Sequence, residues 1–212
     1  MNNHHRVTIR NISLSLAGIL LFGGFVHKPF PLLLLAIGGF AGAALMIGYS
    51  IRNMTVPGAF GMDRLNRKIL LYIIPSILLG FILGILTRNR FELPLLPSGF
   101  TRVALLAPLI GAAEELLFRG YMQGQARPLG RSFSVLYAST GHTIYKLLVI
   151  MTLSAPLQFE PLFLAAWTFI GGVLFGIMRE LSESTIPPVI AHALFDIMLY
   201  GGLASAPLWV WS

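Results

Sequence analysis

Long apolar runs alternate with short polar connections along this chain. A helix that crosses the hydrocarbon core of a bilayer needs about 20 predominantly apolar residues. The pattern therefore predicts an all-α fold, a polytopic membrane helical bundle with about seven transmembrane helices. The runs cover residues 12–26, 31–51, 69–86, 101–124, 133–154, 162–178 and 187–203.

Composition supports a membrane location. Of the 212 residues, 56% are hydrophobic and 11% are charged, whereas a soluble domain carries about 25% charged residues. The mean hydropathy is +0.78. We expect an integral, multi-pass protein of the cell membrane. Because the chain has no cysteine, a disulfide, a thiolate nucleophile and a cysteine-ligated metal are excluded.

The net charge of +7 could indicate nucleic-acid binding, but the basic residues are scattered among the apolar runs. We interpret them as topology determinants and contacts to anionic lipids, so the bilayer is an expected partner and nucleic acid is not. Lysine and arginine are in excess in cytoplasmic loops. If the N-terminus lies inside the cell, the inside segments carry nine lysines and arginines and the outside segments carry four. The inside set is Arg6, Arg10, Arg52, Arg64, Arg67, Lys68, Arg127, Arg131 and Arg179; the outside set is Lys28, Arg88, Arg90 and Arg102.

Small residues recur four positions apart within several runs. Such pairs let the backbones of membrane helices approach closely, although glycine is also common in membrane helices generally. The pairs predict a compact bundle, and no internal repeat divides it. They are Gly38 and Gly42, Gly80 and Gly84, Gly120 and Gly124, and Gly172 and Gly176.

Three ionisable residues interrupt the fourth apolar run: Glu114, Glu115 and Arg119. A charged side chain at the centre of a spanning helix costs roughly 2.5–3.5 kcal/mol, so ionisable residues there indicate a functional site. Glu115 and Arg119 are one helical turn apart and are expected to pair. Glu114 then faces another direction, where a carboxylate in an apolar cavity can act as general base or acid. The alternative is a structural ion pair beside a solvated glutamate.

The later runs carry His142, His192 and Asp196. The last two are four residues apart and share a helix face, so Asp196 can orient the His192 ring and fix its tautomer. Each histidine alone could instead make a packing hydrogen bond. At 1.5 Å per residue, Glu114, His142 and Asp196 lie at similar depths, which predicts that they meet in the cytoplasmic half of the bundle. Lys146, one turn from His142, either extends towards the interface or joins the site as a counter-charge.

These residues resemble three motifs of the CAAX-protease and bacteriocin-processing (CPBP, or Abi) family of intramembrane proteases, which includes the Rce1-type CAAX endopeptidases. Glu114, Glu115 and Arg119 match its Glu-Glu-x-x-x-Arg motif in full. In Phe-x-x-x-His, His142 matches but Ala138 stands at the phenylalanine position. His192 and Asp196 match His-x-x-x-Asn, in which Asp sometimes replaces Asn.

The resemblance covers roughly residues 105–203. It implies a catalytic core of this type at residues 101–212, supported by three transmembrane helices within residues 1–100. Glu114 with His142 would activate a water molecule, and His192 with Asp196 would stabilise the oxyanion. Since an ionised carboxylate cannot donate a hydrogen bond, Asp196 would have to be protonated or act through His192. Glu115 and Arg119 would hold the acidic helix in register.

The family has been described both as metalloproteases and as glutamate-dependent proteases. Two glutamates and two histidines could bind Zn²⁺, but the chain lacks the helical His-Glu-x-x-His signature. We therefore expect no metal and no other cofactor, with Zn²⁺ as the alternative.

The leading hypothesis is an intramembrane endopeptidase that cleaves a membrane-associated or lipidated peptide or protein. A second hypothesis is a non-catalytic scaffold, immunity or regulatory protein of the same family. A third is a small transporter with Glu114, His142 and His192 as a proton relay, although transporters usually show inverted repeats or broken helices.

Overall fold

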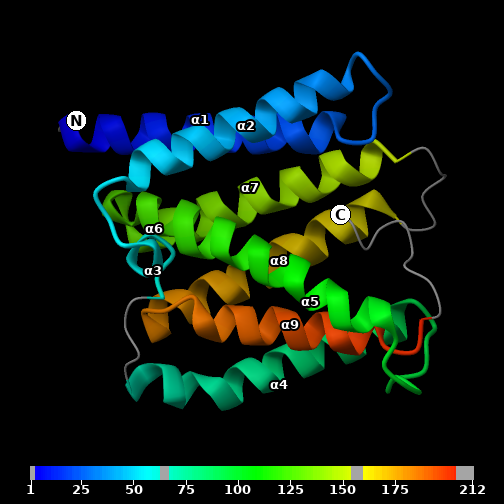
Figure 1. Cartoon of the computed structure of the whole chain (residues 1–212). Coiled ribbons are helices and arrows are strands. Elements are labelled where there is room, and N and C mark those ends of the chain that lie inside the picture. Colours follow the sequence, from blue (N-terminus) through cyan, green and yellow to red (C-terminus); the bar gives the residue numbers. More distant parts are fainter. Residues whose placement is uncertain (1–2, 63–66, 154–159, 204–212) are drawn as a thin grey trace.

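The computed structural model describes residues 3–62, 67–153 and 160–203, and every regular element in these ranges is helical. The predicted all-α fold is therefore confirmed (Figure 1). The end of the fifth predicted run, Ser154, lies outside the described residues. The long helices are α1 (Asn3–Phe25), α2 (Leu33–Ile51), α4 (Arg67–Arg90), α5 (Arg102–Glu115), α7 (Arg131–Met151), α8 (Pro161–Ser182) and α9 (Ile186–Tyr200). Short elements are α3 (Val56–Ala59), the π-helix η1 (Leu116–Met122), α6 (Gln123–Ala126) and the 3₁₀ helix η2 (Arg127–Leu129).

Four of the described helices are long and apolar enough to cross a membrane: His4–Phe25, Leu33–Ile51, Arg67–Arg90 and Pro161–Ser182. Their outer faces carry large exposed apolar side chains, as lipid contact requires. Examples are Leu34, Ile37, Phe40 and Leu45 on α2, and Leu70, Leu71 and Ile74 on α4. The structure is compatible with about seven spans, and that number stays a prediction.

The first helix begins at Asn3, nine residues before the predicted start at residue 12. Its early turns are polar, which hid them from a search for apolar runs. Yet Thr8, Asn11 and Ser15 are buried, and the Ser15 hydroxyl lies 3.2 Å from the Tyr121 hydroxyl in η1. These turns are therefore packed through their polar face.

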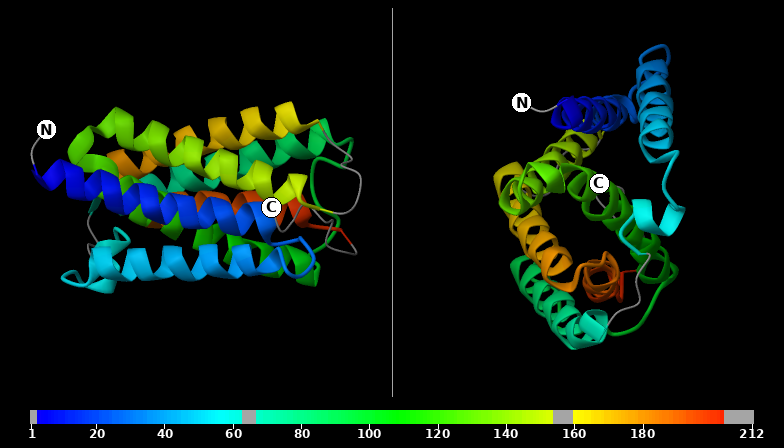
Figure 2. Two further views of the ribbon diagram at one scale, coloured as in Figure 1. Left: turned by 90° about the horizontal axis from the view of Figure 1, so that it is seen from above. Right: turned by 90° about the vertical axis from the view of Figure 1, so that its left-hand side faces the viewer.

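Successive long helices run in opposite directions, so the helix termini lie at two ends of the bundle (Figures 1 and 2). The basic end is the one where α4, α7 and α9 begin and where α3 and α6 lie. There Lys68 lies 2.6 Å from Glu183, which lowers the pKa of that carboxyl below its usual value. The opposite end is the one where α4 and α7 finish and where α5 and α8 begin. The basic end gathers the described residues of the predicted inside set, while Arg64 lies outside the described residues. A cytoplasmic N-terminus stays a prediction.

Two of the counted arginines are buried. Arg88 Nη1 donates to the carbonyls of Met198, Leu199 and Gly201 at 2.9, 3.1 and 2.9 Å, so it caps the end of α9. Arg179 lies 3.1 Å from Glu180. Both side chains thus have structural contacts besides any part in topology.

Glycines bring the site-bearing helices close together. A Cβ atom at Gly80 would lie 2.2 Å from the Ala191 carbonyl oxygen, and one at Gly84 would lie 2.5 Å from the Met198 side chain. Glycine is therefore required where α4 crosses α9. The pair Gly38 and Gly42 has open space around it, so not every predicted pair mediates packing in the described chain.

Candidate active site

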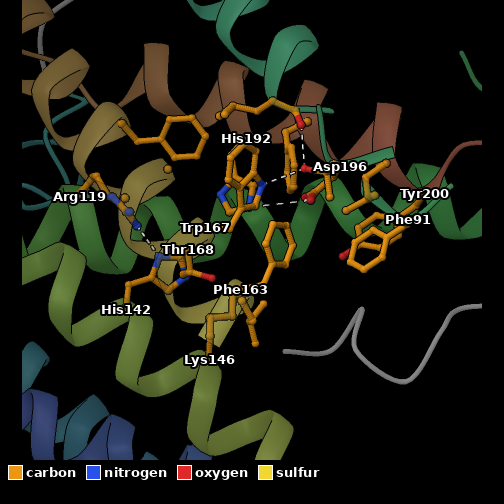
Figure 3. Close-up of a pocket in the computed structure, with 18 residues that line it drawn as sticks. Phe91, Arg119, His142, Lys146, Phe163, Trp167, Thr168, His192, Asp196 and Tyr200 are labelled. Atoms are coloured by element: carbon orange, nitrogen blue, oxygen red, sulfur yellow. Dashed lines mark hydrogen bonds and ion pairs between the residues drawn. The ribbon is translucent and has the colours of Figure 1, made fainter. Parts of the chain in front are cut away.

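Four of the predicted site residues meet inside the bundle. His142 Nε2 in α7 lies 3.3 Å from Glu114 Oε2 in α5. His192 Nε2 in α9 lies 3.9 Å from the same oxygen and 3.8 Å from Asp196 Oδ1. All four side chains are buried. The prediction that they meet is confirmed, and Figure 3 shows both histidines and Asp196 around one cavity.

Glu115 and Arg119 form the expected pair, with Arg119 Nη1 3.2 Å from Glu115 Oε1 and both residues fully buried. The pair also reaches both histidines. Arg119 Nη1 lies 2.7 Å from His142 Nδ1, and His192 Nδ1 lies 2.9 Å from Glu115 Oε1. A continuous polar chain thus runs from His142 through Arg119 and Glu115 to His192. Its geometry fixes the orientation of both rings, a wider role than holding one helix in register.

The contact with Arg119 determines the tautomer of His142. A guanidinium group has only donors, so the Nδ1 atom of His142 must be the acceptor. The ring is then neutral and carries its proton on Nε2, which faces Glu114 Oε2. Neither His142 Nε2 nor Glu114 Oε2 has a hydrogen-bond partner among the described residues. Because the two atoms are only 3.3 Å apart, one small polar molecule beside the pair can contact both of them.

His192 uses its Nδ1 atom as a donor, whereas His142 uses the same atom as an acceptor. The Glu115 carboxylate, paired with Arg119, accepts a hydrogen bond from His192 Nδ1. Asp196 was expected to orient this ring, but its 3.8 Å separation from Nε2 is too long for a hydrogen bond. The expectation that Asp196 orients this ring is therefore wrong, because the carboxylate that does so is Glu115. The i, i+4 spacing places Asp196 on the correct face, yet Glu115 from the neighbouring helix is closer.

Lys146 joins the site. Its Nζ lies 2.7 Å from Glu114 Oε1, and only 13% of its side chain is exposed. Of the two alternatives for this residue, the counter-charge is the one found. One oxygen of Glu114 is thus paired with a cation, while the other faces the two histidines.

The helix that carries the acidic motif changes to a π-helix at Leu116–Met122. π-Helical turns occur frequently at functional sites. Here the turn carries Phe118, whose ring stacks on His142 with centroids 4.4 Å apart and planes at 21°. The aromatic contact to this histidine therefore comes from η1, while Ala138 at the family's phenylalanine position is buried. Neither the π-turn nor this contact was predicted.

Gly111 is a further site residue that sequence reasoning missed. A Cβ atom there would lie 2.5 Å from Asp196 Oδ2 and 3.0 Å from the His192 ring. Gly111 precedes Glu114 by three residues and so lies on the same helix face, which is the signal that could have found it. Its lack of a side chain lets α9 bring Asp196 and His192 against α5.

We expect Gly111→Ala to lower activity at least about tenfold, because misplaced catalytic groups commonly cost that much or more. The added methyl group must displace Asp196 or the His192 ring. Ala112→Gly, at a half-buried neighbouring position, is the matched control for altered helix propensity. The measurement is the processing rate in membranes at equal protein abundance. Equal rates for Gly111→Ala and wild type would contradict the tight approach.

The cavity beside these residues has a volume of about 120 Å³. Its floor carries Arg119, His142, His192 and Asp196, and its walls are mostly apolar and aromatic. Leu83 and Thr87 of α4 line it too. Trp167 Nε1 in α8 donates to Thr87 Oγ1 at 2.8 Å, which joins α8 to α4 across the cavity wall. The contribution of α4 was not predicted. An apolar cavity with a few convergent polar groups is typical of a substrate site.

The donor set fits Zn²⁺ poorly. Among the described residues, no group of three or more histidine, aspartate and glutamate side chains is arranged to hold a metal ion. One oxygen of Glu114 is paired with Lys146. His142 Nε2 carries the ring proton as long as Arg119 donates to Nδ1, so it has no lone pair for a metal. Absence of a metal remains a prediction.

Comparison with known families confirms the resemblance. Residues 94–198 match the family described as Rce1-like, type II CAAX prenyl endopeptidase Rce1-like. This segment of the chain therefore belongs to the Rce1-like CAAX protease family, and it contains the six residues that match the three motifs. No curated protein and no solved structure matched in the corresponding searches. With its apolar helices, this is an integral membrane protein that carries a domain of the intramembrane-protease kind.

Proposed function

We propose that the protein is an intramembrane endopeptidase that hydrolyses a peptide bond in a membrane-associated or lipidated substrate, with a water molecule activated by Glu114 and His142. The observation that carries this proposal is the facing pair of Glu114 Oε2 and His142 Nε2, 3.3 Å apart, with His142 lining the apolar cavity and Glu114 lining a small crevice beside it. We assign residues 101–212 to the catalytic core and residues 1–100 to its support, with Leu83 and Thr87 reaching into the cavity.

Glu114 is the general base. Its Oε2 takes a proton from water as the oxygen attacks the peptide carbonyl, while His142 Nε2–H positions that oxygen. The C–N bond then breaks, and the proton moves from Glu114 to the leaving amine. Lys146, at 2.7 Å from the other carboxylate oxygen, favours the ionised form of the buried Glu114.

His192 stabilises the developing oxyanion. Its Nδ1 is held by Glu115, which leaves Nε2 directed at Glu114 and Asp196. A proton on Nε2 makes this atom a donor at the point where negative charge forms. The Asp196 carboxylate, 3.8 Å from Nε2, balances the charge of the ring.

The experiment that tests the function compares peptide termini in host membranes. One strain carries the wild-type chain and the other carries Glu114→Ala at equal abundance. New uncleaved precursors in the mutant are expected, and they would identify the substrate. Identical termini, with any null phenotype still rescued by the mutant, would overturn the catalytic proposal in favour of a binding role.

Removal of metal is expected to leave the activity unchanged. One oxygen of Glu114 is already paired with Lys146. Arg119 donates to His142 Nδ1, which leaves the ring proton on Nε2 and no lone pair there for a metal. The measurement is cleavage of an identified precursor in membranes before and after treatment with a zinc chelator. Loss of cleavage on chelation, with recovery on added Zn²⁺, would contradict the metal-free mechanism.

A further inference from the structure

Half-exposed residues of the cavity lining lie towards the end opposite the basic end. They include Phe91, just after α4, and Phe163, Leu164 and Thr168 in the early part of α8. The Phe163 ring packs against Phe91 with centroids 6.1 Å apart and against Trp167 at 5.9 Å. These residues belong to the end where α4 finishes and α8 begins. In Figure 3, Phe91 and Tyr200 lie on the far side of the cavity from Arg119.

A second, smaller crevice lies beside Glu114. It is lined by Ala107, Ile110 and Gly111 of α5 together with Tyr200, and its volume is about 10 Å³. A space of roughly 10–15 Å³ accommodates one water molecule. This crevice can therefore hold one water molecule next to Glu114.

Buried polar contacts fill the bundle between the site and the basic end. The fully buried Gln123 donates from Nε2 to the Gly176 carbonyl at 2.9 Å and to Glu180 Oε1 at 3.0 Å. Arg127 and Arg179 each lie 3.1 Å from Glu180. A substrate that entered from this end would have to separate these charges in a buried setting, which is costly.

The segment around α3 closes the same end. Thr185 donates from Oγ1 to the Phe60 carbonyl at 2.7 Å, and its backbone N–H donates to the Gly61 carbonyl at 3.0 Å. A Cβ atom at Gly120 would lie 2.7 Å from the Phe60 carbonyl oxygen, so η1 and this segment are in close contact. At the other end, the cavity-lining residues Phe91, Phe163 and Leu164 are half-exposed.

We propose that the active site is loaded from the end opposite the basic end, by a peptide presented on the non-cytoplasmic side of the membrane. Among the described residues, the basic end carries eight of the counted lysines and arginines and the opposite end carries four, or seven and three when the buried Arg179 and Arg88 are left out. That excess assigns the basic end to the cytoplasm. The aromatic mouth suits a substrate with an apolar side chain or acyl group near the scissile bond. This inference rests on the proposed function for the identity of the site.

Single cysteines provide the test, because the chain has none of its own. Thr168→Cys, with Leu164→Cys as a second variant, reports on the cavity mouth. Ser98→Cys, exposed between α4 and α5, marks the opposite end, and Ser132→Cys, exposed at the start of α7, marks the basic end. A membrane-impermeant maleimide is added to intact cells and, separately, to lysed cells that contain the full chain.

We expect Thr168→Cys and Ser98→Cys to react in intact cells, and Ser132→Cys to react only after lysis. Reaction of Ser132→Cys but not Ser98→Cys in intact cells would reverse the orientation and overturn the proposal. The proposal would also be overturned if Thr168→Cys and Leu164→Cys both reacted only after lysis, or if both stayed unreactive even then. Labelling does not require catalysis, so a chain that cleaves nothing would still give the expected pattern. Failure of the proposed function is thus distinguishable from failure of this inference.

Discussion

Glu114→Gln is expected to lower the rate of precursor cleavage by about 10²–10⁴-fold, the range that general acid–base catalysis contributes. The substitution keeps the size and shape of the side chain but removes the proton acceptor that faces His142 at 3.3 Å. It also removes the carboxylate charge 2.7 Å from Lys146. The measurement is the cleavage rate in membranes at equal protein abundance, with thermal unfolding in detergent as a check on folding.

The control for this variant is Glu160→Gln. Glu160 precedes α8, its side chain is 74% exposed, and it lies 3.8 Å from Arg90 in an exposed ion pair. An exposed pair of this kind contributes about 0–1 kcal/mol, so the control should cleave at the wild-type rate. A Glu114→Gln variant that cleaves as fast as the control would show that Glu114 is not the base.

Much of the site could be predicted because its residues are chemically conspicuous in apolar surroundings. A carboxylate or histidine inside a long apolar run carries a free-energy cost that indicates a function, and Glu114, His142 and His192 stood out for that reason. Helical periodicity then paired Glu115 with Arg119 correctly, since positions four residues apart stay neighbours even where η1 begins.

Contacts between helices could not be predicted in the same way. Periodicity relates positions on one helix but does not say which residue of a second helix comes nearest. Thus Glu115, and not the i+4 neighbour Asp196, holds His192. Thr87 of α4 and Trp167 of α8 carry no unusual pattern in the sequence, yet their hydrogen bond joins two walls of the cavity. The polar turns of α1 were missed because packing through a polar face leaves no apolar signature.

The buried pair of Glu115 and Arg119 provides the second large effect. Glu115→Gln and Arg119→Gln are each expected to destabilise the protein by about 3–5 kcal/mol, because each leaves the partner charge buried and uncompensated. The double variant should be more stable than the sum of the two losses, because it leaves neither charge unpaired. Thermal unfolding of the four proteins in detergent measures this coupling. Additive losses would show that the two charges do not interact.

Recovery of stability should not bring recovery of activity. In the double variant, a glutamine at position 119 can donate to His142 Nδ1 or accept from it, so the ring is no longer restricted to the tautomer with its proton on Nε2. His192 Nδ1 likewise loses its carboxylate acceptor. A carboxylate or cation that orients a catalytic histidine acts through the tautomer, and loss of the correct tautomer alone has cost about 10⁴-fold elsewhere. A stable double variant that cleaves at least about 10²-fold more slowly than wild type would therefore assign the pair to orienting both histidines. Wild-type cleavage by the same variant would reduce the pair to a structural support of the bundle.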